Sequence, residues 1–228
     1  MYAKSILPAL LAVVALVSQV DAQVTARSYS TGGVATANAQ GQGNVQLHAD
    51  ASAANGGWAN ANINGSGLWG GRAEGLSVAA ANGGFARSDV NSHAQGWNAR
   101  SYGESVAATN FGTAISEGNA FARGNSQAIS RSAAFGDFGH ARSRSDAEAY
   151  AQRGGTSFAQ SDSVADALFG TAQSQSGARA ISDFGGTAVS RGQAIGLGWG
   201  RNANAGAFAE SQGYFGGFSQ SNAYHLDW

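Results

Sequence analysis

The residues best suited to metal or acid–base chemistry are scattered along this chain. Four histidines, His48, His93, His140 and His225, lie 45 or more residues apart, and the chain has no cysteine. A zinc site needs three or four ligands in a recognisable spacing, and no such spacing occurs here. The sequence therefore predicts surface histidines, no metal site and no cofactor.

The tightest pair of carboxylates is Asp146 and Glu148, which follow Arg142 and Arg144. Residues two apart in a strand point to the same face, so these four side chains predict a charge ladder on a solvated surface. A catalytic carboxylate pair needs a cleft and unequal environments, and nothing in the sequence indicates either.

Other catalytic motifs are also missing. Serine is frequent, but no G-x-S-x-G turn occurs in a supporting context. A phosphate-binding loop needs G-K-[ST], and the only lysine is Lys4. We therefore predict no catalytic residues and no enzyme activity.

One modification motif is present. Asn64-Gly65-Ser66 is the sole N-x-[ST] sequence in the chain, which makes Asn64 the candidate N-glycosylation site. A glycan attached at this position must face solvent.

The elements that carry these residues follow a simple pattern. Alanine, serine or glycine occupies every second position over long stretches, most clearly at 141–151, 172–182 and 203–211. Period two is the side-chain period of a β-strand, so each stretch has one face of tiny side chains and one mixed face.

Glycine divides the pattern into units. It supplies 34 of 228 residues, about twice the ordinary ~7%, and the later units repeat every 13 to 16 positions. Glycine supplies the positive φ angles of tight turns, so the roughly ten residues between turns are predicted strands. The units open near Gly32, Gly43, Gly56, Gly70, Gly83, Gly96, Gly112, Gly139, Gly154, Gly170, Gly185, Gly200 and Gly216.

This periodicity predicts an all-β fold, a repetitive array of units in a single region, 23–228. Two architectures fit: a long-stranded antiparallel sheet or meander with one strand per unit, and a β-solenoid with one unit per coil. Unbroken alternation favours long strands, because the corners of a coil usually interrupt it. A disordered low-complexity chain is the third alternative.

The first 22 residues differ from the rest. An apolar run follows Lys4, and Val20 and Ala22 frame a small-residue cleavage site. The run is too short for a membrane span, which needs ~20 residues, so residues 1–22 are a predicted secretory signal peptide. We expect a secreted, extracellular protein with no membrane association after cleavage.

Composition excludes several partners. The net charge is −1 and no basic patch occurs, so we expect no binding to nucleic acid or to an anionic membrane. The region after residue 22 has no proline and no lysine, and these are residues that block pairing between exposed strands. Self-association is therefore expected.

The Ala/Ser alternation at 141–151, 172–182 and 203–211, with its Gly-Gly punctuation, resembles that of secreted Gly/Ala/Ser-rich structural proteins of the silk, glue, cuticle and eggshell type. The resemblance implies a non-catalytic matrix protein that self-associates through repetitive strands. An alternative is a soluble β-solenoid that binds a regular surface such as ice, chitin or another glycan. Ice is disfavoured because the outward residues that begin at His140 and at Thr171 do not match. A glycine-rich antimicrobial polypeptide is less favoured, because such proteins need net positive charge.

Overall fold

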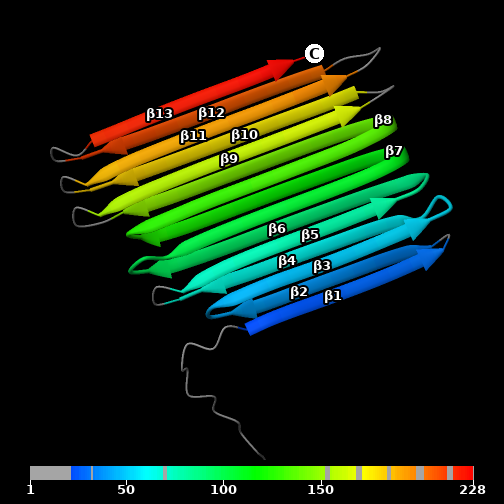
Figure 1. Ribbon diagram of the computed structural model, residues 1–228, viewed down its shortest axis with the longest axis horizontal. Coiled ribbons are helices and arrows are strands. Elements are labelled where there is room, and N and C mark those ends of the chain that lie inside the picture. Colours follow the sequence, from blue (N-terminus) through cyan, green and yellow to red (C-terminus); the bar gives the residue numbers. More distant parts are fainter. Residues whose placement is uncertain are drawn as a thin grey trace, which may run out of the picture.

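The protein is a flat β-solenoid in which the chain winds through two stacked layers of strands (Figure 1). The computed structural model describes residues 22–31, 33–68, 71–151, 155–167, 171–183, 186–198, 203–214 and 218–227. Nearly all of these residues are in strands, so the predicted all-β repetitive fold is confirmed. The strands are β1 (Ala22–Thr31), β2 (Val34–Gln42), β3 (Val45–Ala54), β4 (Trp58–Gly67), β5 (Arg72–Ala81), β6 (Gly84–Gly96), β7 (Arg100–Gly124), β8 (Ser126–Ala151), β9 (Thr156–Ala167), β10 (Thr171–Ser182), β11 (Thr187–Gly198), β12 (Ala203–Gly213) and β13 (Phe218–Asp227).

Two of the strands, β7 and β8, pass through both layers. Layer A contains β1, β3, β5, the first halves of β7 and β8, then β9, β11 and β13. Layer B contains β2, β4, β6, the second halves of β7 and β8, then β10 and β12. Every pairing in these ladders is parallel, so of the two architectures left open by the sequence the protein has the solenoid and not the antiparallel sheet.

Each coil contains two of the predicted units, not one. Gly84 pairs with Gly112 and Phe111 with Phe138, whereas in the C-terminal coils His140 pairs with Thr171. These partners are 27 to 31 residues apart, about twice the unit length. The expectation of one unit per coil is corrected, because each unit forms one strand of one layer and the next unit returns in the other layer.

The corners explain why the alternation survives. Gly112 has φ 143°, and a Cβ built on it would lie 1.8 Å from the backbone oxygen of Gly84 in the previous coil. Beside this corner the rings of Phe111 and Phe138 stack with their centroids 5.0 Å apart. The turn is therefore made at glycine, and the strands on either side keep strict alternation. Of the other predicted turn glycines, Gly43, Gly56, Gly83 and Gly96 have positive φ, whereas Gly32, Gly70, Gly154, Gly170, Gly185, Gly200 and Gly216 lie outside the described residues.

The space between the layers is filled by the small side chains. Ala147, Ala178 and Ala205 are 3%, 0% and 9% exposed, which confirms the predicted small inner face. The strands of layer B lie in the gaps between the strands of layer A, and each contacts two of them. With side chains this small, the layers approach closely enough for the Ser116 hydroxyl to donate to the Ser105 backbone carbonyl at 2.7 Å.

A zigzag of buried serine hydroxyls follows this stagger through the centre of the solenoid. Consecutive members belong to alternate layers, and their Oγ atoms are 2.6 to 3.2 Å apart. Buried hydroxyls are costly unless they are hydrogen-bonded, and this arrangement satisfies them within the core. The members are Ser77, Ser88, Ser105, Ser116, Ser132, Ser143, Ser163 and Ser174.

The few large core residues are placed opposite glycine. A Cβ on Gly75 would lie 2.7 Å from Ile63 Cγ2 and 2.9 Å from Val90 Cγ1, and a Cβ on Gly65 would lie 3.2 Å from Leu47 Cδ1. Interiors are close-packed, so glycine in one layer makes room for an aliphatic side chain from the other. The N-terminal coils therefore use Gly with large residues where the later coils use Ala with Ser.

The predicted signal peptide lies outside the described residues except for Ala22, the first residue of β1. Secretion thus stays a prediction. None of the strands or turns described gives way to a helix long and apolar enough to cross a bilayer.

Candidate functional site

The residues that the sequence singled out for chemistry are kept apart by the fold. His48 in β3 faces outward from layer A with its Nε2 2.8 Å from Asp50 Oδ2. His93 and His140 lie on layer B in different positions along their strands, and His225 lies in β13. In the described part of the chain no three His, Asp or Glu residues gather in a way that could hold a metal ion.

The predicted charge ladder at the β8 surface is present. Arg144 Nε lies 2.8 Å from Asp146 Oδ2, and Arg179 Nη1 lies 3.8 Å from Glu148 Oε1 on the neighbouring strand. These side chains are more than one-third exposed, and exposed ion pairs contribute little to stability. The ladder therefore fixes the charge pattern of the face more than it stabilises the fold.

The most extensive concave feature is a groove on the outer face of layer B. It crosses the strands from Gln40 in β2 to Phe208 in β12 and has a volume of about 740 Å³. Its direction is that of the coil stack, because its two walls are rows of side chains that occupy equivalent positions on successive strands. We refer to this feature as the layer B groove.

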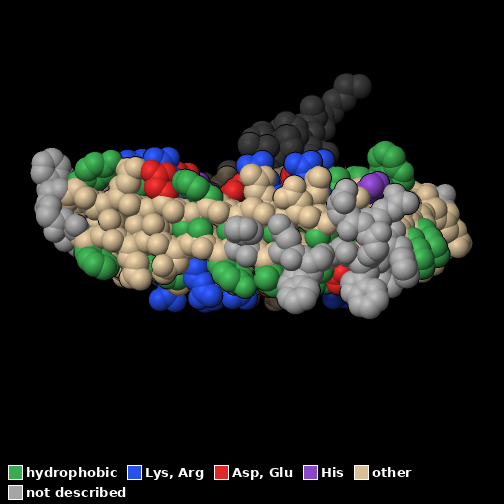
Figure 2. All heavy atoms as spheres, turned by 90° about the horizontal axis from the view of Figure 1, so that it is seen from above, with side chains coloured by type: hydrophobic (Ala, Val, Ile, Leu, Met, Phe, Trp, Pro, Cys, Tyr) green, Lys and Arg blue, Asp and Glu red, His purple; other side chains and the backbone are tan. Residues whose placement is uncertain are grey.

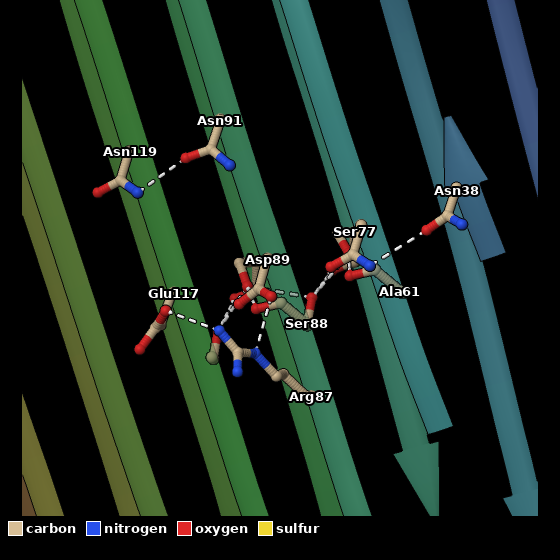
Figure 3. A network of polar contacts seen from close by, with 12 residues as sticks. Asn38, Ala61, Ser77, Arg87, Ser88, Asp89, Asn91, Glu117 and Asn119 are labelled. Carbon is tan, nitrogen blue, oxygen red and sulfur yellow. Dashed lines mark hydrogen bonds and ion pairs between the residues drawn. The ribbon is translucent and has the colours of Figure 1, made fainter. Parts of the chain in front are cut away.

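One wall of the groove is a row of primary amides. Asn91 Nδ2 donates to Asn64 Oδ1 at 3.2 Å, and Asn119 Nδ2 donates to Asn91 Oδ1 at 2.9 Å (Figure 3). Gln40 extends this row onto β2. A primary amide has two N–H donors and two lone pairs, so each amide within the row keeps one N–H and one lone pair for a ligand.

The opposite wall is partly aromatic. The His93 and Phe121 rings stack with their centroids 4.6 Å apart and their planes 12° apart. Burial lowers the pKa of His93 below its ordinary value, which keeps the ring neutral at neutral pH. The groove therefore has polar, uncharged amides on one side and a flat uncharged ring pair on the other.

A second row of polar residues runs parallel to the amides on the side away from the groove. Asn62 donates to Asn38 at 3.1 Å, and in later coils Arg87 lies between Asp89 and Glu117 (Figure 3). Burial raises the pKa of Asp89, and this effect outweighs the lowering by the adjacent Arg87 guanidinium. Opposite charges in this row are matched within the row itself.

The outer face of layer A has a different character. Val78, Val106, Ala133, Val164 and Ile195 occupy one register position on five successive strands and form an aliphatic row. Seen along the coil stack, charged side chains lie on both broad faces while the interior between them contains none in view (Figure 2). The same scaffold thus carries an amide groove on one face and an aliphatic row on the other.

The predicted glycosylation site lies in the groove wall. Asn64 is outward-facing, as the sequence requires of an acceptor, and its Oδ1 accepts the hydrogen bond from Asn91. The amide row itself was not foreseen from the sequence. The signal for it is the separation of Asn64, Asn91 and Asn119 by one coil each, which becomes informative only when the coil length is known.

Comparison with known proteins identifies no relatives for this arrangement. No family model matches the chain, and no curated protein and no solved structure matches it either.

Proposed function

We propose that the chain is a secreted, non-catalytic structural protein of an extracellular fibre, coat or matrix, and that it self-associates through the end strands of its solenoid. The observation that carries this proposal is the exposure of the inner face of β13. Ser219, Ser221 and Ala223 are exposed, whereas the residues that precede them by one coil at the first two positions, Ala188 and Ser190, are fully buried.

The exposure follows from the stagger of the layers. Each strand of layer B lies between two strands of layer A, and both end strands of the described solenoid, β1 and β13, belong to layer A. Among the described residues β13 pairs only with β11, so the next place in layer B, beside β12 and opposite β13, is open.

A second copy fits this open place when it is related to the first by a two-fold axis along the strand direction. Its β13 then pairs antiparallel with β12 of the first copy, and the first copy's β13 pairs with its β12. Both layers continue without a gap, and the small inner faces of the two β13 strands cover each other. Such isologous contacts are the commonest in homo-oligomers.

A head-to-tail stack fits less well. If β1 of one copy paired with β13 of the next, layer A would continue but layer B would lack one strand at the junction, because both end strands belong to layer A. The same two-fold construction applied at β1 would join pairs into a filament. Exposed strand edges are templates for such pairing, and low net charge does not oppose it.

A proline on the open edge tests the contact. Phe218 N–H donates to Gly186 on the β11 side, and alternate residues of a strand direct their N–H groups to opposite sides. Ser221 N–H therefore points to the open edge, and Ser221→Pro removes it without loss of a β11 bond. Ser221→Ala is the matched control, since it keeps the N–H group.

Sedimentation velocity over a range of concentrations is the measurement, on the chain that begins after residue 22. We expect wild type and Ser221→Ala to associate and Ser221→Pro to remain monomeric with an unchanged β-rich circular dichroism spectrum. A monomeric wild type at all concentrations, or a folded Ser221→Pro that associates like wild type, contradicts the proposal.

A further inference from the structure

We infer that the layer B groove binds one chain of an extended, uncharged polysaccharide, laid across the strands and parallel to the coil stack. The inference rests on the groove and not on self-association, because the groove lies on an outer face and the open edge of β13 lies at the end of the stack.

The shape of the groove selects a polymer. It reaches seven strands, from β2 to β12, and strands are spaced about 4.8 Å apart, which gives a length of about 30 Å. A compact metabolite would fill only part of this length. A straight chain of several sugar units fits it, since one unit of an extended β-1,4-linked glycan is close to the strand spacing in length.

The amide wall selects hydroxyl groups. Asn64, Asn91 and Asn119 repeat at every strand and each has unused hydrogen-bonding capacity beyond the row. A hydroxyl both donates and accepts, as does a free amide, so a polyhydroxylated chain can bond to each amide in turn. The row is fixed in orientation by its own hydrogen bonds, which lowers the entropy lost on binding.

The ring wall selects a ligand with an apolar face. The stacked pair of His93 and Phe121 presents an uncharged surface next to the amides. The C–H face of a pyranose ring can lie against such a surface while its equatorial hydroxyls reach the amide wall. Sites of this kind combine apolar contact with a few placed polar groups.

The charge pattern excludes polyanions. From Gln40 to Phe121 no lining residue except His93 is titratable. At the C-terminal end the groove has Asp146, Glu148 and Arg179, and their charges are paired with one another or with Arg144. Nucleic acids and acidic glycans need rows of unpaired cations, which this groove lacks.

A peptide is disfavoured by direction. An extended peptide usually joins a sheet by pairing with an edge strand, where backbone groups are free. The layer B groove runs perpendicular to the strands and over paired backbone, so it offers side-chain amides and not a free edge. A sugar chain needs no backbone ladder.

Co-sedimentation with insoluble chitin and with crystalline cellulose tests the inference, with polygalacturonate gel as the charged comparison. The chain is produced without N-glycosylation, because a glycan on Asn64 would occupy the groove itself. Binding to chitin alone identifies N-acetylglucosamine units, and binding to both neutral polymers identifies the shared β-1,4 geometry. Each of these results supports the inference.

The double variant Asn91→Ala/Phe121→Ala removes one residue from each wall and should weaken binding about ten-fold or more. Gln173→Ala is the control, since Gln173 is an exposed residue of the same layer outside the groove. No binding to either neutral polymer, equal binding to polygalacturonate, or a double variant that folds and binds like wild type overturns the inference. Ser221→Pro, assayed in parallel, should bind like wild type, so failure of one proposal is distinguishable from failure of the other.

Discussion

The inner and outer faces of the same strands obey different rules. In β10, inward Ala178 is fully buried against the opposite layer, while Gln175, three positions earlier, is exposed. Inner positions along the solenoid are almost all Ala, Ser or Gly, because neighbouring layers leave room for little else. Outer positions vary from coil to coil. The interior therefore builds the scaffold, and the outer faces are free to differ, as the amide groove and the aliphatic row do.

The largest effect should come from overpacking the inner face. Ala178→Leu should destabilise the protein by ~1–3 kcal/mol, since a close-packed core resists added volume. Gln175→Leu, in the same strand and on the outer face, should change stability by no more than ~0.5 kcal/mol. Thermal melts of both variants are sufficient. If Gln175→Leu is as damaging as Ala178→Leu, or if neither moves the melt, the difference between the faces is only compositional.

A smaller effect should come from the serine zigzag. Ser116→Ala keeps the size of the side chain but removes the hydrogen bonds to the Ser105 carbonyl and hydroxyl, which should cost about 1 kcal/mol. The outer-face control Ser52→Ala should be close to neutral. Urea midpoints measure the difference. Equal midpoints for Ser116→Ala and wild type would mean that the core requires small residues but not hydroxyls.

The smallest effect at neutral pH should come from an outer-face tyrosine. Burial, together with the hydrogen bond to Glu104, raises the pKa of Tyr102 to about 12. Because the folded-state pKa lies above the ordinary value of about 10, the stabilisation is complete below about pH 10 and is lost as the pH rises towards about 12.

Urea unfolding of wild type and Tyr102→Phe across this alkaline range measures that contribution. Wild type should lose stability more steeply than the variant, which lacks the ionisable phenol, and the two should respond alike below about pH 9. Parallel loss of stability in both proteins up to about pH 12 would show that Tyr102 has no such role.

Much of the fold could be predicted from the sequence. The alternation of Ala and Ser placed Ala147, Ala178 and Ala205 on one buried face, and the turn glycines Gly43, Gly56, Gly83, Gly96 and Gly112 do have positive φ. These features are local, since side-chain period and turn conformation depend on neighbouring residues. The choice between antiparallel and parallel pairing is not local, and it was left open with the antiparallel sheet favoured.

The candidate site was the least predictable part. Asn64 was singled out only as a glycosylation acceptor, whereas Asn91, Asn119 and Phe121 carried no signal in the linear sequence. They form a wall only because each coil returns the chain to the same place after 27 or 28 residues. Co-location across coils is a property of register, and register depends on how long each corner is.

The sequence by itself determined the β period, the small inner face, the positions of several turns and the scarcity of charge, because each follows from residue type and spacing. Only the tertiary structure decided that two units make one coil, that layer B lies in the gaps of layer A, and that the amides align into a groove. The physical reason is that these features depend on contacts between residues about one coil apart. Such contacts are selected by packing the two layers against each other and not by the conformational preference of any single strand.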